Sequence, residues 1–129
     1  MGHVSYRLEK IPRSGVREIF DMARGVQNLV HLELGEPDFR MPEHVTEAAI
    51  QALRDGFTKY TPNAGLEELR EAISEKLKRE NQIDAGPNGE ILVTAGSMEA
   101  LSLSVLSTVN ENDEVLIPDP GYVSYAAQV

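Results

Sequence analysis

The stretch ILVTAGSMEALSLSVL, residues 91–106, passes directly from a strand pattern into a helix pattern. An apolar run at 91–94 predicts a strand, and the residues that follow Gly96 predict a helix over 97–109. A second apolar run at 114–117 predicts another strand. Together these segments predict one β-α-β unit, in which the strands run parallel and are joined by a right-handed crossover.

Two interpretations of the junction Ala95-Gly96-Ser97-Met98 stay open on the residues alone. In the first, the unpaired N–H groups of the first helical turn, the helix dipole and the Ser97 hydroxyl form a cradle for an anion, which Gly96 allows to approach closely. In the second, the junction is an ordinary strand-to-helix turn with Ser97 as the N-cap. The stretch is neither a P-loop nor a G-x-G-x-x-G motif.

Tyr122 follows the second predicted strand, at the end of the proline-flanked turn 118–122. Parallel strands end at one sheet edge, where open α/β proteins bind ligands, so we expect Tyr122 and residues 96–98 on the same side. The tyrosine ring there would either stack on a planar ligand or be half-buried in the core.

The rest of the chain adds more predicted helices and a third strand candidate. Parallel sheets need several strands with helices on both faces, and few strand candidates exist here. We therefore expect the α/β fold of a larger protein, of which this chain is the N-terminal part and in which the parallel sheet is incomplete. The patterns predict helices from Ser14 to Gly25, Pro42 to Gly56 and Leu66 to about Glu80, a helix that begins within 123–129, and a strand at 28–34.

Composition excludes several classes of partner. The 129 residues include 21 acidic and 12 basic side chains, for a net charge of −9, which disfavours binding to nucleic acids and anionic membranes. There is no cysteine, so disulfides, thiol catalysis and thiolate metal sites are absent. No apolar run has the length of a membrane span and the first residues lack a secretory pattern, so we expect a soluble, cytoplasmic protein.

Other polar residues are interpreted as structural rather than functional. Glu36 and Asp38 flank Pro37 and are assigned to turn chemistry, because no third ligand for a metal lies nearby. The histidines are scattered without the spacing of a metal site, so no metal is expected. The residues assigned to isolated or surface positions are His3, His31, His44, Lys59, Lys76 and Lys78.

Five stretches occur in a recognisable order: SGVREIFDMA (14–23), LELGEPDF (32–39), KYTPNAGLEELREAI (59–73), ILVTAGSMEAL (91–101) and DEVLIPDPGYVSY (113–125). Taken together they resemble the N-terminal third of class I/II aminotransferases, the fold-type I enzymes that depend on pyridoxal 5′-phosphate. The resemblance spans nearly the whole chain and is closest to the aspartate/aromatic branch. It implies that residues 1–45 form the N-terminal arm and small-domain segment, and that 46–129 begin the large, cofactor-binding domain.

The resemblance also implies roles for the residues at the two loops. Gly96, Ser97 and Met98 match the cup in which backbone N–H groups and a hydroxyl hold the cofactor phosphate. Tyr122 matches the aromatic residue that stacks on the pyridine ring. Tyr125 completes a YxxY pattern and is assigned to packing.

Two further matches concern the substrate and a second subunit. Tyr60 matches a tyrosine whose hydroxyl reaches the cofactor phosphate of the neighbouring subunit, which implies a homodimer with shared active sites. Gly35 matches the glycine whose backbone lies beside the substrate carboxylate. No catalytic residue is expected within this chain, because the family's Schiff-base lysine falls beyond residue 129 and none of the lysines present lies in its motif: Lys10, Lys59, Lys76 and Lys78.

The resemblance therefore predicts the N-terminal part of an enzyme that moves an amino group from aspartate, an aromatic amino acid or a similar donor to a 2-oxo acid. The fragment alone is expected to be inactive. Alternatives are another enzyme of the same fold, such as a C–S lyase or an aminocyclopropane-carboxylate synthase, and a non-catalytic ligand-sensing domain. A self-contained small α/β domain with an ordinary turn at Gly96 is the remaining alternative.

Overall fold

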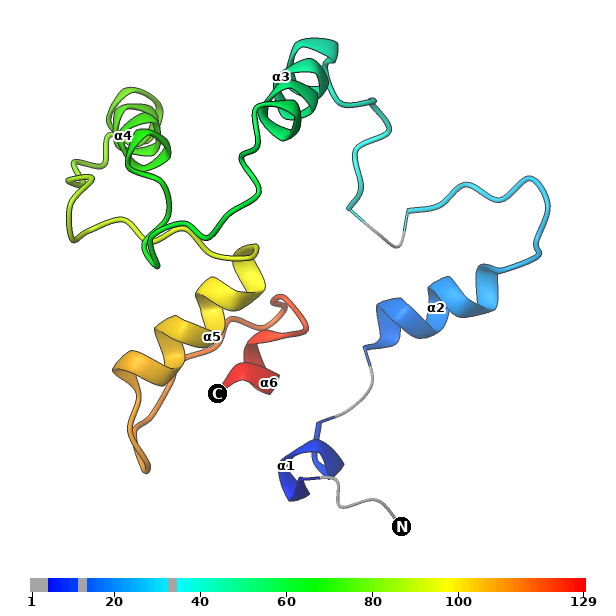
Figure 1. Cartoon of the computed structure of the whole chain (residues 1–129). Coiled ribbons are helices and arrows are strands. Elements are labelled where there is room, and N and C mark those ends of the chain that lie inside the picture. The colour runs from blue at the N-terminus through cyan, green and yellow to red at the C-terminus, as the bar shows by residue number, and fades with distance from the viewer. Residues whose placement is uncertain (1–4, 12–13, 33–34) are drawn as a thin grey trace.

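The computed structural model describes residues 5–11, 14–32 and 35–129, and every regular element among them is helical (Figure 1). The helices predicted from apolar periodicity are confirmed, whereas the sequence patterns do not predict the short helix at the start. In chain order the elements are α1 (Tyr6–Glu9), α2 (Gly15–Ala23), α3 (Glu43–Arg54), α4 (Glu67–Lys76), the π-helical turn η1 (Leu77–Asn81), α5 (Ser97–Thr108) and α6 (Tyr125–Gln128).

The helix ends follow from proline and glycine. Pro42 occupies the N-cap of α3, where its missing N–H group leaves no intrahelical hydrogen bond unmade. Gly56 follows the same helix at φ +83°, and its amide donates to the carbonyl oxygen of Leu53 at 3.1 Å. A left-handed glycine in this place is a common helix ending. Ser14 is the N-cap of α2, but its side chain makes no capping hydrogen bond.

The third predicted helix extends to Asn81, but its last turn is widened to a π-turn. The carbonyl oxygen of Leu77 accepts the amide of Ile83 at 3.1 Å, and Gln82 between them takes a left-handed conformation with φ 58°. The chain then returns along α4, where the Ser74 hydroxyl donates to the carbonyl oxygen of Ala85 at 2.6 Å.

The predicted parallel sheet is not confirmed. Residues 91–94 and 114–117 carry no strand, nor does any other described residue, and the candidate at 28–34 lies partly outside the described residues. A strand forms only where its backbone pairs with a neighbour, and apolar patterning does not supply that neighbour. The amide of Val93 instead donates to the carbonyl oxygen of Ala64 at 3.0 Å. The sheet of the expected α/β fold is thus not confirmed in this chain, whose described elements are helical.

The described residues form no closed hydrophobic core. The chain's accessible surface is 12,097 Å², and none of the described side chains is buried. A compact monomer of this mass would expose about 6,800 Å². Figure 1 accordingly shows helices spread apart and joined by long coil segments. The alternative of a self-contained small domain does not agree with this open arrangement.

Partial burial is concentrated in two places. In the first, side chains of α4 bond to the loop before it and to residues 85–88. In the second, α5 lies against α6 and residues 115–118. Figure 1 shows the coil after α5 running back alongside this helix. Among the described helices, none combines the length and the apolar character needed to cross a membrane.

Candidate functional site

The junction between residues 91–94 and α5 has the backbone of an open helix N-terminus. Gly96 is the N-cap of α5, with φ 83° and ψ 171°, a conformation that side chains with a Cβ rarely adopt. No atom lies within 4 Å of the position where a Cβ would stand, so the backbone angle rather than crowding requires glycine. The N-cap is therefore Gly96, and the alternative that Ser97 caps the helix is wrong.

The first amides of α5 have no hydrogen-bond partner from the N-cap residue. Ser97 is the first helical residue, and the N-cap Gly96 has no side chain with which to bond the first amides. The initial N–H groups of a helix have no intrahelical acceptor, so those of Ser97 and Met98 are available to a ligand. The helix dipole makes that ligand preferentially an anion.

Three hydrogen bonds fix the turn that presents these amides. The Thr94 hydroxyl donates to the carbonyl oxygen of Gly96 at 2.9 Å, and the Gly96 amide donates to the carbonyl oxygen of Thr94 at 2.8 Å. The Glu99 carboxylate accepts the amide of Ala95. This resembles the reach-back half of a capping box, except that the glutamate accepts the amide of the residue before the N-cap rather than that of the N-cap itself.

Thr94 and Glu99, which hold this turn, are not among the residues predicted from the sequence. Their signal is present in the sequence, because a glutamate three residues after the N-cap is typical of a helix start. The carboxylate also adds a negative charge in the first turn of α5. That charge agrees with the helix dipole but opposes a bound anion.

Tyr122 lies in the coil before α6 and is half-exposed. Its ring meets that of Tyr125 edge-on, with the ring centroids 5.7 Å apart and an interplanar angle of 76°. The amide of Tyr125 donates to the carbonyl oxygen of Tyr122 at 3.0 Å. One edge contact leaves much of the Tyr122 ring uncovered, and an aromatic face in this state can stack on a planar group.

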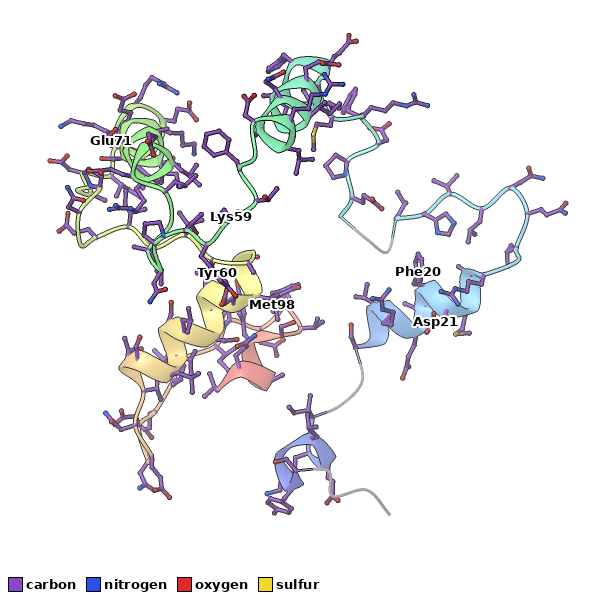
Figure 2. All side chains as sticks on the ribbon, in the orientation of Figure 1. Phe20, Asp21, Lys59, Tyr60, Glu71 and Met98 are labelled. Carbon is purple, nitrogen blue, oxygen red and sulfur yellow. The ribbon has the colours of Figure 1, made fainter. Side chains whose placement is uncertain are left out.

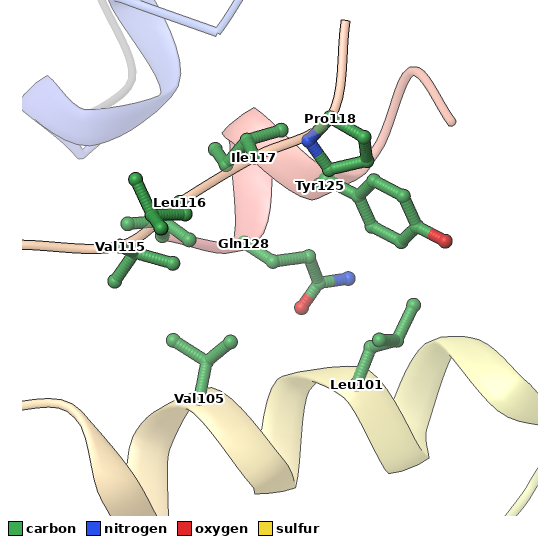
Figure 3. A pocket seen from close by; sticks show the side chains of 9 residues that line it. Leu101, Val105, Val115, Leu116, Ile117, Pro118, Tyr125 and Gln128 are labelled. Atoms are coloured by element: carbon green, nitrogen blue, oxygen red, sulfur yellow. The ribbon is translucent and has the colours of Figure 1, made fainter. Parts of the chain in front are cut away.

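Residues 115–118, α5 and α6 line an apolar groove of about 290 Å³. Figure 3 shows Leu101 and Val105 of α5 on one side, facing Tyr125, Gln128 and residues 115–118. The Ser102 hydroxyl donates to the Gln128 side-chain oxygen at 2.5 Å and ties α5 to α6. Neither Gly96 nor Ser97 lines this groove, so it packs the elements that carry the candidate site rather than forming that site.

The other two candidates lie on loops. Tyr60 is in the coil between α3 and α4 (Figure 2) and is fully exposed. Gly35 is exposed as well, with no atom within 4 Å of its Cβ position. The structure thus brings the Tyr122 segment beside the helix that begins at Ser97, while Tyr60 and Gly35 stand on separate coil segments. The expectation that Ser97 and Tyr122 share a sheet edge is not confirmed, since no described residue forms a sheet.

The remaining polar residues lie at the surface, in agreement with the sequence. Lys76 pairs with Glu80 at 3.6 Å and Lys78 with Asp84 at 3.2 Å, both in exposed positions. Within residues 5–11, 14–32 and 35–129, no three His, Cys, Asp or Glu side chains are grouped so as to hold a metal ion. His3 lies outside those residues.

Two basic neighbours lower the pKa of the Glu80 carboxyl. The hydrogen bond from Arg79 at 2.7 Å is the main cause that holds the pKa of Glu80 below its usual range, with a smaller contribution from the charge of Lys76. Glu80 belongs to η1, whereas the cup amides belong to α5. This shift therefore reflects a surface ion pair rather than the candidate site.

Known proteins match this chain over most of its length. Residues 27–129 match the family described as aminotransferase class I and II. The chain is 45% identical over 126 residues to aromatic-amino-acid aminotransferase 2 of Thermococcus litoralis and 47% identical over 126 residues to aspartate aminotransferase of Pyrococcus abyssi. Each match covers 98% of this chain and 32% of the relative, so the chain spans about a third of these curated relatives.

A solved structure agrees with the whole described backbone. A mutant of Thermus thermophilus aspartate aminotransferase, solved with tryptophan, is 40% identical and superposes with a TM-score of 0.87. The match covers 99% of this chain and 34% of that protein. The open arrangement of helices seen here thus resembles one part of a much longer folded enzyme.

Proposed function

The chain belongs to the class I and II aminotransferases, and from that premise we propose that it is the N-terminal part of a pyridoxal phosphate-dependent aminotransferase. The reaction is the transfer of an amino group from an amino acid to a 2-oxo acid. The names of the relatives support aspartate or an aromatic amino acid as the donor. The family is generally dependent on this cofactor.

The open N-terminus of α5 is the observation that carries the proposal. A phosphate dianion needs several N–H or O–H donors, a positive field and room for its oxygens. The uncapped amides of Ser97 and Met98 and the Ser97 hydroxyl are such donors, and Gly96 leaves the space beside them open. The residues present therefore fit the phosphate of the cofactor.

The other assigned residues would hold the remaining parts of the bound molecules. The uncovered face of Tyr122 suits the pyridine ring, and the exposed hydroxyl of Tyr60 suits a phosphate oxygen. We assign the backbone of Gly35 to the substrate carboxylate. When bound, the cofactor supplies the electron sink of the reaction, and the chain's own residues bind and orient it. We assign no catalytic residue within this chain.

The exposed apolar surface fits a chain that packs against further protein. Helices α2 and α3 contact no other described helix, although both carry an apolar face. We propose that residues 1–45 are the arm and small-domain segment and that 46–129 begin the large domain. The homodimer and the cytoplasmic location stay predictions.

The test is the affinity of the complete protein for pyridoxal phosphate. Ser97→Ala removes one donor to a charged group, so we expect the dissociation constant to rise about tenfold. Absorbance titration of the cofactor measures it. Ser107→Ala is the matched control, because this serine donates to the Ser104 carbonyl oxygen in the last turns of the same helix. Equal affinities for the two variants would contradict the assignment of Ser97.

A further inference from the structure

Arg70, on the inner side of α4, is half-buried and reaches three acceptors on two segments. Its Nε donates to the carbonyl oxygen of Gly65 at 3.3 Å, in the loop before α4. Its Nη1 donates to the carbonyl oxygen of Pro87 and, at 3.1 Å, to the side-chain oxygen of Asn88. One guanidinium thus ties the loop before α4 to the segment that follows η1.

The same loop is fastened to the segment that leads into α5. The amide of Val93 donates to the carbonyl oxygen of Ala64 at 3.0 Å. A Cβ on Gly65 would stand 2.6 Å from the Val93 side chain, so the two segments are in close contact there. Val93 is three residues before Gly96, so the loop is docked directly beside the start of the cup turn.

Along the chain, Tyr60 lies between α3 and the contact of Ala64 with Val93. The loop is held at its first end by the amide of Phe57, which donates to the carbonyl oxygen of Ala52 at 3.0 Å. At its second end it is held by a turn in which the Gly65 amide donates to the carbonyl oxygen of Pro62 at 2.9 Å, and by Arg70. The Tyr60 side chain itself is fully exposed. Its position is therefore set by the two ends of the loop rather than by packing of its ring.

We propose that Arg70 is a positioning residue for cofactor binding, which fixes the Tyr60 loop against the segment leading to the cup. This inference rests on the proposed function. The planar fork of arginine matches the arrangement, because two of its nitrogens bind separate segments at fixed angles. A lysine in the same place offers a single point charge and cannot hold both segments in the same way.

The experiment is a double-mutant cycle in the complete protein, with the dissociation constant of pyridoxal phosphate as the readout. In the parent protein, Tyr60→Phe removes a hydroxyl donor to the phosphate and is expected to weaken binding about tenfold. In the Arg70→Met background the loop is released, so the same Tyr60→Phe change is expected to alter binding less than twofold. Such non-additivity is the signature of two residues that act as a unit.

Arg79→Met is the matched control, since Arg79 is an exposed arginine that pairs with Glu80 on the surface of η1. The Tyr60→Phe effect in that background is expected to stay about tenfold. If Arg70→Met does not fold, Arg70→Lys is used in the same cycle and is expected to give an intermediate value. Additive effects of the two changes, or unchanged affinity after replacement of Arg70, would overturn the inference. Failure of the parent protein to bind the cofactor would instead refute the proposed function.

Discussion

Gly65 is a position where the structure leaves no room for a side chain. Its φ of +96° is unfavourable for any other residue, and a Cβ would stand 2.6 Å from the Val93 side chain. Gly65→Ala must therefore strain the backbone or separate the loop from residue 93. We expect the free energy of unfolding of the complete, cofactor-free protein to fall by about 1–3 kcal/mol, as measured by urea denaturation.

Gly15→Ala is the control for this change. Gly15 is the first residue of α2, has no positive φ and has no atom within 4 Å of its Cβ position. Alanine there is expected to leave the free energy of unfolding within about 0.5 kcal/mol or to raise it slightly. Equal free energies of unfolding for the two variants would show that Gly65 and Val93 are not in contact in solution.

The ion pairs of Glu80 predict that the stability of η1, at the end of α4, depends on pH. The hydrogen bond from Arg79 lowers the pKa of this carboxyl in the folded chain, so the charged form is favoured by folding. Its small stabilisation is present above the ordinary pKa of glutamate, roughly pH 4, and is lost as the pH falls through the lowered folded-state pKa. An NMR titration of the Glu80 carboxyl should give a pKa below that of an unfolded glutamate, and Arg79→Gln should raise it. A pKa unaffected by Arg79→Gln would contradict this account.

The sequence suggests the candidate site but not the contacts between distant residues that hold its segments together. Gly96 and Ser97 follow from the local pattern of an apolar run, a glycine and a hydroxyl before a helix. Contacts of Arg70 with Pro87 and of Val93 with Ala64 join residues far apart along the chain. No local pattern encodes such pairs, so the sequence alone does not predict them.

The Glu99 carboxylate is one of the groups that hold the N-terminus of α5. Glu99 accepts the Ala95 amide and also complements the helix dipole, and Glu99→Ala removes both effects. We expect the amide of Ala95 to exchange its hydrogen about fivefold faster in the complete protein. Glu99→Gln keeps an acceptor and should show a smaller increase. Unchanged exchange in both variants would indicate that the capping contact is absent in solution.

Helices were predictable from this sequence because their hydrogen bonds are local. Apolar spacing together with Pro42 and Gly56 is enough to locate α3, and the same reasoning locates α2 and α5. The strands predicted at 91–94 and 114–117 are not formed in the described chain. Apolar patterning marks a surface that could pair but does not supply the chain that pairs with it. The π-turn at η1 was also missed, since its wider hydrogen bonding has no distinct sequence pattern.

As a whole, the described chain is an open arrangement of helices rather than a closed domain. The 12,097 Å² of accessible surface and the lack of any buried described side chain leave apolar faces uncovered on separate helices. The backbone nevertheless superposes on a third of a longer aminotransferase with a TM-score of 0.87. The backbone and the family therefore agree, and the proposed binding of a cofactor phosphate at Gly96 is what remains to be measured.

The most direct test is the absorbance spectrum of pyridoxal phosphate bound to the complete protein, recorded before and after addition of an amino acid. We predict that aspartate or an aromatic amino acid changes the spectrum of the bound cofactor and that a 2-oxo acid restores it. For the 129-residue chain alone we predict no such response, and a borohydride-trapped adduct on one of its lysines would contradict this. A complete protein that binds no cofactor, or whose bound cofactor does not respond to any of these amino acids, would contradict the assignment as an aminotransferase.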